Sequence, residues 1–152
     1  MKEPVPILNY YEQCASTNDL AREKAAIGVP EGNIYWTDCQ TQGRGRRGRA
    51  WLSDFPGSLA MSILVRPDMP AVRNNFLSII AALLLRNTLD KLIMCHLRNK
   101  KTLKHPIPKI KWPNDIIINN KKASGILIEN SYSGDLMSYG VVGFGINLNN
   151  TD

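Results

Sequence analysis

The sequence predicts an α+β fold in which a mixed, largely antiparallel β-sheet is flanked by helices. Runs of strand-forming residues recur along the chain, as in Asn33–Gln40 and Ser58–Val65. Two stretches with helical spacing of apolar residues interrupt these runs. The later strands are separated only by short turn-forming segments such as Asn119–Lys122, which is typical of hairpins. A length of 152 residues favours one domain with a substantial core.

Two helices are expected. The first follows Ser16–Asn18, carries apolar residues from Leu20 to Ile27 at helical spacing, and is predicted to end at Gly28, with Pro30 just beyond. The second covers Asn74–Leu92. The apolar residues expected to form its core-facing stripe are Phe76, Ile79, Ile80, Leu83, Leu84, Leu89 and Leu92.

The remaining regular segments read as strands. They are Ile7–Cys14, Asn33–Gln40, Ser58–Val65, Lys109–Lys111, Ile116–Ile118, Ala123–Glu129 and Leu136–Leu148. Turns are predicted at Ser53–Gly57, at Asn119–Lys122 with a lysine pair at the tip, and at Ser131–Asp135. An exposed basic loop is expected at Arg98–Lys104. Gly143 and Gly145 interrupt the last strand and predict either a bulge or a close approach by another group.

Charge and composition limit the classes of function. The formal net charge of +6 and the pI near 9.4 favour anionic partners, and much of the excess lies in the Gly43–Arg49 loop and in Arg98–Lys122. Three widely spaced cysteines predict neither a disulfide framework nor a zinc site, and the two histidines lack ligand spacing. The longest apolar run, Phe76–Leu85, is too short to span a bilayer. These features, with no signal peptide at Met1, predict a cytoplasmic protein without a membrane partner.

Gly43–Trp51 reads GRGRRGRAW and is the most distinctive stretch. Guanidinium groups bind phosphate or carboxylate oxygens in pairs, and glycines let the backbone approach a ligand closely. Trp51 adds a flat face on which a purine ring can stack. The stretch therefore indicates either a loop that closes over an anion or a solvated loop that contacts nucleic acid through its charge.

Three other segments also have two readings when taken alone. Ser16–Asn18 can cap a helix, or its hydroxyl and amide groups can hold a small polar ligand. Lys111–Asp115, which reads KWPND, and Lys122 can be solvated hairpin residues or site residues. Gln40 ends a strand beside the arginine loop, where its amide can bind a polar ring.

Together these segments resemble the catalytic domain of biotin–protein ligases. The matching pieces follow one another in the order that the family shows, from about residue 7 to about residue 149. They are Ser16-Thr17-Asn18, Gln40, the GRGRRGR loop with Trp51, KWPND, KASGILIE at Lys122–Glu129, and GFGIN at Gly143–Asn147. The resemblance implies the fold shared by biotin ligases and class II aminoacyl-tRNA synthetases.

The resemblance also implies an activity. Members use ATP to convert biotin into biotinyl-5'-AMP and then transfer biotin to a lysine of a biotin carboxyl carrier domain, with Mg²⁺ bound to the triphosphate. The implied catalytic residues are Lys122, Arg46, Lys111 and Asp115. The implied biotin-binding residues are Ser16, Thr17, Asn18, Gln40, Arg44, Gly45, Arg46, Lys122 and Gly125. Those implied for ATP and the adenylate are Arg46, Arg49, Trp51, Lys111, Asn114, Lys122 and Asn147. No metal site is expected among the protein residues, and Lys111 and Asn114 are implied to steady the triphosphate and its magnesium.

Residues 1–152 match the N-terminal and central part of that catalytic domain. The resemblance implies that further helices and a small β-barrel domain follow this part in family members, and that a DNA-binding helix-turn-helix precedes Ser16 only in members that repress transcription. Members often form homodimers through the central sheet. No nucleic-acid partner is expected here.

Three alternatives stay open at this level: a lipoate–protein ligase with the same fold and adenylation logic, a basic-loop nucleic-acid-binding module, and a remnant that binds biotin without activating it. The density of arginines favours biotin over lipoate, and the scarcity of aromatic residues among the arginines disfavours RNA. The ligase hypothesis requires that Lys122 and the arginine loop border one shared cavity.

Overall fold

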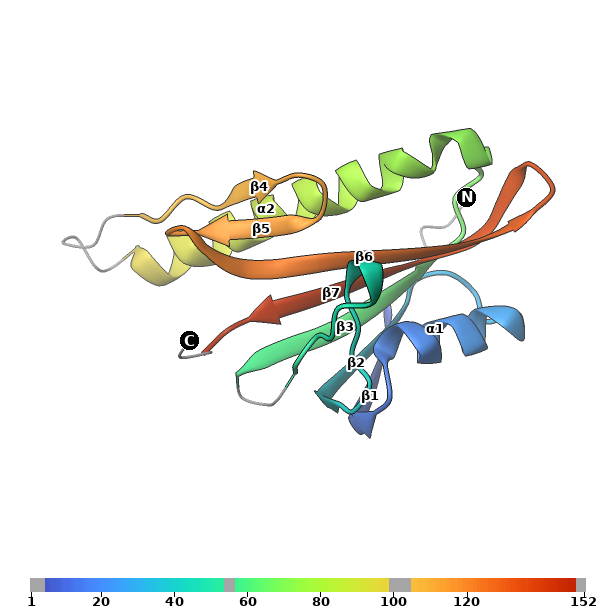
Figure 1. Ribbon diagram of the computed structural model, residues 1–152, viewed down its shortest axis with the longest axis horizontal. Coiled ribbons are helices and arrows are strands. Elements are labelled where there is room, and N and C mark those ends of the chain that lie inside the picture. The colour runs from blue at the N-terminus through green and yellow to red at the C-terminus, as the bar shows by residue number, and fades with distance from the viewer. Residues whose placement is uncertain (1–4, 54–56, 99–104, 150–152) are drawn as a thin grey trace.

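A computed structural model describes residues 5–53, 57–98 and 105–149. Its centre is a seven-stranded sheet in the order β1-β2-β3-β7-β6-β5-β4, in which β1 and β2 run parallel and the other neighbours run antiparallel (Figure 1). The predicted mixed, largely antiparallel sheet is confirmed. The elements are β1 (Ile7–Cys14), α1 (Thr17–Ala26), β2 (Asn33–Gln40), a short 3₁₀ helix η1 (Arg46–Gly48), β3 (Ser58–Val65), a second 3₁₀ helix η2 (Ala71–Arg73), α2 (Asn74–Leu97), β4 (Lys109–Lys111), β5 (Asp115–Ile118), β6 (Lys121–Ser133) and β7 (Leu136–Asn147).

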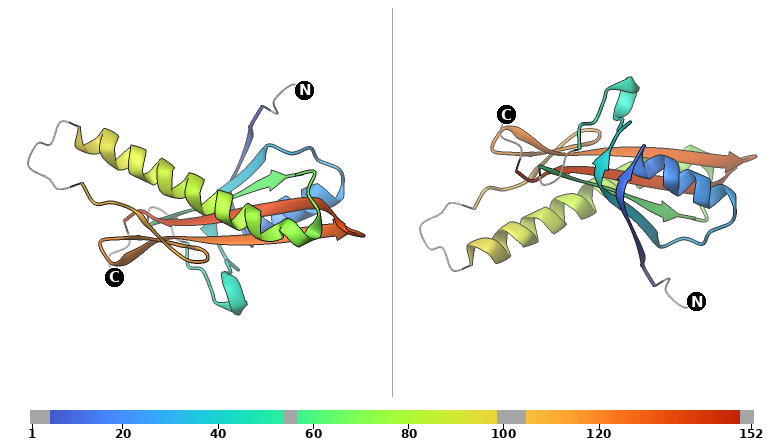
Figure 2. Two further views of the ribbon diagram at one scale, coloured as in Figure 1. Left: turned by 90° about the horizontal axis from the view of Figure 1, so that it is seen from above. Right: turned by 90° about the horizontal axis from the view of Figure 1, so that it is seen from below.

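The two α-helices lie on opposite faces of the sheet (Figure 2). Helix α1 packs Ala21 and Ala25 against Tyr35, Leu64 and Val141. Consecutive residues of a strand point to opposite faces, so the residue after Val141 belongs to the second core, under α2. This second core consists of Ala81, Ala82, Leu85, Ile116, Ile126 and Val142.

Helix α1 ends as predicted. Gly28 has a φ of +87°, its N–H donates to the carbonyl of Ala25, and the N–H of Val29 donates to the carbonyl of Lys24. This pair of bonds is the Schellman arrangement, which satisfies carbonyls that the last turn would otherwise leave unpaired. The other end differs from the capping interpretation, because the Ser16 side chain makes no capping hydrogen bond. The carbonyl oxygen of the Gln40 side chain accepts the Thr17 N–H instead, at 2.9 Å.

The core-facing stripe predicted for the second helix is wrong for most of its members, although Leu89 packs against the core. Of its members, Phe76, Leu84 and Leu92 are 55%, 62% and 61% exposed, whereas Ala81 and Ala82 are buried. The helix is apolar over most of its circumference, so periodicity alone does not select the packed side. The two alanines do, because small side chains let α2 approach the sheet closely. The helix also continues to Leu97, five residues beyond the predicted end.

The lysine pair predicted at a hairpin tip lies in a strand. Asn119 and Asn120 form the tip, with φ values of +51° and +62°, and Lys121 and Lys122 begin β6. Two-residue hairpin turns favour positive φ at both central positions, and asparagine adopts this region more readily than lysine. Strand β6 also runs to Ser133, so the turn predicted at Ser131–Asp135 is shorter and contains Gly134.

The two glycines of β7 mark close approaches. The β3–β7 register is unbroken from Ser58, opposite Asn147, to Val65, opposite Gly140, so no bulge lies at Gly143 or Gly145. Their positions in the sheet leave room for side chains of the site.

Two sequence predictions concern segments that the structure describes only in part. The basic loop at Arg98–Lys104 and the turn at Ser53–Gly57 lie largely outside the described residues. In the described ranges, no helix is long and apolar enough to cross a membrane.

Candidate active site

A cavity of about 430 Å³ lies where the start of α1, the arginine loop, the KWPND segment and strands β6 and β7 meet. It borders both Lys122 and Arg46, so the requirement for one shared cavity is met. The predicted site residues that line it are Ser16, Thr17, Asn18, Gln40, Arg44, Gly45, Arg46, Arg49, Trp51, Lys111, Asn114, Asp115, Lys122 and Gly125.

One part of the cavity wall carries neutral polar groups. Thr17 and Gln40 meet there: the carbonyl oxygen of Gln40 accepts from the Thr17 N–H and lies 3.2 Å from the Thr17 hydroxyl oxygen. Because a backbone N–H can only donate, this contact fixes the Gln40 amide with its oxygen toward α1 and its Nε2 group available as a donor. Gly43 allows this packing, since a Cβ there would lie 2.9 Å from Gln40 Nε2 and would collide with the Trp51 carbonyl.

Asn18 also borders the cavity, but its amide binds protein partners. Asn18 Nδ2 donates to Glu129 Oε2 at 2.7 Å, and its Oδ1 accepts from Ser62 at 2.6 Å. A Cβ at Gly143 would collide with this Oδ1. One of the predicted close approaches is therefore the docking of Asn18 against β7.

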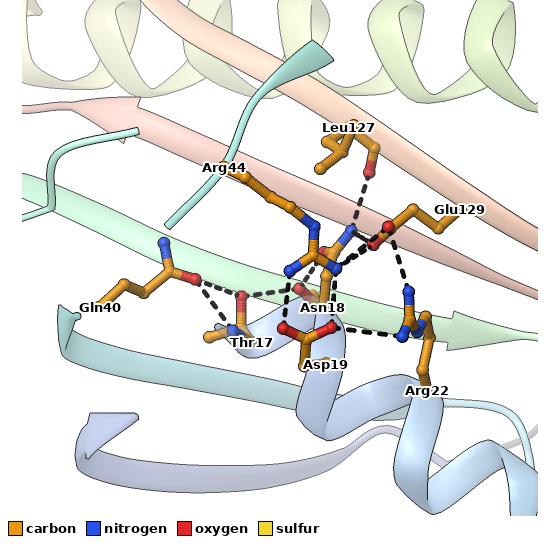
Figure 3. Close-up of polar contacts among 9 residues, drawn as sticks. Thr17, Asn18, Asp19, Arg22, Gln40, Arg44, Leu127 and Glu129 are labelled. Carbon is orange, nitrogen blue, oxygen red and sulfur yellow. Dashed lines mark hydrogen bonds and ion pairs between the residues drawn. The ribbon is translucent and has the colours of Figure 1, made fainter. Parts of the chain in front are cut away.

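Arg44 anchors the arginine loop to α1 and β6 (Figure 3). Its guanidinium donates to Asp19 at 2.6 and 2.7 Å and to Glu129 at 3.0 Å. Arg22 contacts the same two carboxylates at 3.5 and 3.4 Å. The hydrogen bonds from Arg44 lower the pKa of Asp19, and the bond to Asp19 raises the pKa of Arg44. We call these four residues the carboxylate clasp.

Beyond Arg44 the loop folds back on itself. Gly45 donates to the carbonyl of Arg49 at 2.7 Å, and Arg44 and Ala50 form an isolated antiparallel bridge. The turn of η1 lies between them, with φ values of +57° at Arg47 and +72° at Gly48. This compact turn holds several guanidinium groups beside the cavity.

Another part of the cavity wall carries cations. Lys122 Nζ lies 2.8 Å from Asp115 Oδ1 and 5.6 Å from the centre of the Trp51 ring. The indole rests on β7, where a Cβ at Gly145 would collide with it, so this glycine accounts for the second close approach. Arg46 Nη1 donates to Asn114 Oδ1 at 3.3 Å, which joins the arginine loop to the KWPND segment. The cavity is thus bordered by a neutral donor–acceptor pair and by a group of cations.

Comparison with known proteins agrees with this geometry. The profile of the Biotin/lipoate A/B protein ligase family matches residues 10–147. The chain belongs to this family.

Several relatives of this chain are named as ligases. It is 35% identical to the bifunctional ligase/repressor BirA of Bacillus subtilis, over 93% of this chain and 40% of that protein. It is 38% identical to the biotin–[acetyl-CoA-carboxylase] ligase of Paracoccus denitrificans, over 88% of this chain and 52% of that protein. The biotin protein ligase of Leishmania major in complex with biotinyl-5-AMP superposes with a TM-score of 0.70 at 31% identity, covering 94% and 57% of the two chains. The chain therefore spans about half the length of these relatives.

Asn147 differs from the other predicted site residues because it does not border the cavity. Its Nδ2 donates to the carbonyl of Lys122 at 2.8 Å. In the structure Asn147 therefore supports the backbone that carries Lys122.

The sequence predictions missed residues that hold the walls of this cavity together. Asp19 and Glu129 bind Arg44, and the fully buried Ser62 binds Thr17 and Asn18. Asp19 follows the Ser16–Asn18 motif, Glu129 ends the KASGILIE motif, and both carry charge opposite to the loop, which is a usable signal. The sequence signal for Ser62 was weaker: its hydroxyl lies on the same face of β3 as the buried Ala60 and Leu64.

Proposed function

We propose that this chain carries the activation site of an ATP-dependent biotin–protein ligase, which forms biotinyl-5'-AMP and directs biotin to a lysine of a carrier domain. The observation that supports it is the polarity of the cavity. The cavity is bordered both by a neutral donor–acceptor pair, Thr17 and Gln40, and by the cations Lys122, Arg46 and Arg49. Biotin carries the matching groups, a neutral ureido ring and a carboxylate.

In the first step a biotin carboxylate oxygen attacks the α-phosphorus of ATP. An oxygen–phosphorus bond forms, the bond between the α-phosphorus and its bridging oxygen breaks, and pyrophosphate leaves with that oxygen. Two anions must approach one another, so fixed cations lower the barrier. We assign this role to Lys122, with Arg46 and Arg49 on the phosphate oxygens and Lys111 beside the triphosphate.

The adenine base and the second step use neighbouring residues. Trp51 borders the cavity, and its indole is the proposed platform for adenine. Asn114 is proposed to steady the triphosphate. Asn147 is proposed to support nucleotide binding indirectly, because it holds the backbone of Lys122. In the second step a carrier lysine amine attacks the acyl carbon, an amide bond forms and AMP leaves. We propose that Asp115, which is paired with Lys122, orients that amine and accepts its proton.

The Mg²⁺ that the family implies fits a site shared with the nucleotide. The described residues contain no group of three or more histidine, cysteine or carboxylate side chains able to hold a metal ion. Mg²⁺ commonly keeps waters and binds through one or two protein oxygens together with substrate phosphates. Asn114 and Asp115 border the cavity and are the proposed protein oxygens, and the ion would neutralise charge on the triphosphate.

The carrier is proposed to be a biotin carboxyl carrier protein or domain, because relatives are named for acetyl-CoA carboxylase. Cys14, Cys39 and Cys95 are free, which fits the cytoplasmic location that we propose. A homodimer stays a prediction.

The neutral part of the cavity wall also separates biotin from lipoate. The dithiolane ring of lipoate has neither an N–H nor a carbonyl group, so it would leave the Gln40 amide unpaired. The basic-loop alternative for nucleic acid is not favoured either, because the chain matches the Biotin/lipoate A/B protein ligase family and its relatives include biotin ligases.

Pyrophosphate release tests the proposal. The chain should release pyrophosphate when biotin and ATP are both present, and neither substrate alone nor lipoate with ATP should support it. Isothermal titration should detect biotin binding and no lipoate binding of comparable strength. Absence of both biotin binding and pyrophosphate release would refute the assignment.

A further inference from the structure

Ser62 lies outside the cavity but contacts two of the residues that border it. Its side chain is fully buried in β3, with Oγ 2.7 Å from Thr17 Oγ1 and 2.6 Å from Asn18 Oδ1. A hydroxyl has one proton, so Ser62 can donate to only one of these oxygens.

The neighbouring groups decide which oxygen receives that proton. Asn18 Nδ2 donates to the Glu129 carboxylate, which is paired with Arg44, so the oxygen of the Asn18 amide must face Ser62. An amide oxygen can only accept, and Ser62 therefore donates to Asn18.

The direction of the remaining bond follows. Because the Ser62 proton is used, the 2.7 Å contact requires the Thr17 hydroxyl to donate to Ser62. The Gln40 oxygen keeps the Thr17 N–H as its partner. Towards the cavity, Thr17 Oγ1 can then only accept hydrogen bonds. Gln40 Nε2, beside it, can only donate them.

We propose that Ser62 is a positioning residue that fixes this acceptor–donor order and so selects a ring carrying adjacent N–H and C=O groups, such as the biotin ureido ring. The relay runs from the Thr17 hydroxyl to Ser62 and on to Asn18. The inference deepens the proposed function and rests on it for the identity of the ligand. Ser62 acts through Thr17 and Asn18 without touching the ligand.

A ligand-free measurement tests the relay itself. Proton NMR of the wild-type chain should show slowly exchanging hydroxyl protons of Thr17 and Ser62, with the Thr17 hydroxyl proton close to the Ser62 β protons. A Thr17 hydroxyl proton close to the Gln40 γ protons instead would overturn the relay.

A ligand series tests the consequence for selectivity. The probes are biotin and its two ring carbamates, in which one ureido N–H is replaced by an oxygen that can only accept. In the wild type, one carbamate sets this oxygen against the Thr17 lone pairs and should bind at least tenfold more weakly than biotin. In Ser62→Ala the Thr17 hydroxyl can turn and donate to that oxygen, so the discrimination should fall several-fold.

Ser58→Ala is the matched control. Ser58 is buried on the same face of β3, and its Oγ has no hydrogen-bond partner among the described residues. The control should keep the wild-type discrimination. Equal discrimination in Ser62→Ala and Ser58→Ala would overturn the proposal, even if Ser62→Ala bound both ligands more weakly, because weaker binding alone indicates only structural damage. If the wild type binds no biotin, the proposed function is refuted. The NMR measurement then tests the direction of the hydrogen bonds at Ser62 without any ligand.

Discussion

The guanidinium of Arg44 makes two parallel hydrogen bonds to the carboxylate of Asp19, at 2.6 and 2.7 Å, across 25 residues of chain. The same group reaches Glu129 on β6, so one side chain joins the arginine loop to a helix and to the sheet. Bidentate pairs of this kind have defined geometry as well as attraction. They hold the start of the arginine loop against the wall of the cavity.

Removing the charge of Asp19 should loosen the loop. In Asp19→Asn, Arg44 loses a bidentate partner, and we expect unfolding to become easier by about 1–3 kcal/mol. Biotin affinity should fall with it. Chemical denaturation and titration calorimetry measure both effects. Asp38→Asn is the control, since Asp38 pairs with the exposed Tyr10 hydroxyl away from the clasp; equal losses in the two variants would contradict a special role for Asp19.

The clasp should also weaken in acid. Arg44 lowers the pKa of Asp19 below its model-compound value of 3.8, so the folded state keeps this group deprotonated where the unfolded state binds a proton. The stabilisation is therefore complete above about pH 5 and is lost as the pH falls through the lowered value. The stability difference between wild type and Asp19→Asn should shrink over that range. A difference independent of pH down to pH 2 would rule out this linkage.

Lys122 should be needed for adenylation. Lys122→Met keeps much of the side-chain length but removes the cation at the junction of carboxylate and phosphate, and pyrophosphate release should slow by roughly 100-fold to 1,000-fold. Lys121→Met is the control, because Lys121 precedes it in β6 and points to the other face of the sheet. Similar rates for the two variants would exclude Lys122 from the proposed role.

Gly145 should tolerate no side chain. In Gly145→Ala the new methyl group collides with the Trp51 indole, so the ring must leave its place on β7. We expect a cost of about 1–3 kcal/mol and weaker ATP binding. Gly45→Ala, where the nearest atom lies 3.6 Å from the added Cβ, should change stability little. Equal stabilities of Gly145→Ala and Gly45→Ala in unfolding experiments would contradict the close approach of Trp51 to Gly145.

Arg46 should retain the adenylate. Its guanidinium lies beside the cavity and contacts Asn114, so Arg46→Gly removes a cation from the proposed phosphate site. Loss of a charged hydrogen bond corresponds to roughly tenfold faster escape of the intermediate. Released adenylate should then label lysines of an unrelated protein such as serum albumin. Equal labelling by wild type and variant would count against this function of Arg46.

The sequence was enough to predict the layered α+β fold and the residues that surround the cavity. Short motifs carry that information locally: strand alternation, the end of α1 at Gly28, and the arginine–glycine loop are all set by neighbours in the chain. The side of α2 that packs was not predictable in this way. Leu84 and Ala82 both suit a core, and only the shape of the opposing sheet selects the alanine.

The contacts that shape the site are also long-range. Asn18 meets Ser62 and Glu129, 44 and 111 residues away, and no local pattern reveals such partners. The conformation of the β5–β6 turn was missed for a different reason. The charge of the lysine pair suggested an exposed tip, whereas the backbone conformation of the tip favours the two asparagines that precede the lysines.

Gln40 combines a structural task with recognition, since one atom of its amide closes the first turn of α1 while the other faces the cavity. Engineering the proposed site to accept a different acid would start at this position. A replacement that serves only the new substrate would leave the Thr17 N–H unpaired and fray the helix. Altered selectivity must therefore come with a second substitution that supplies the missing acceptor.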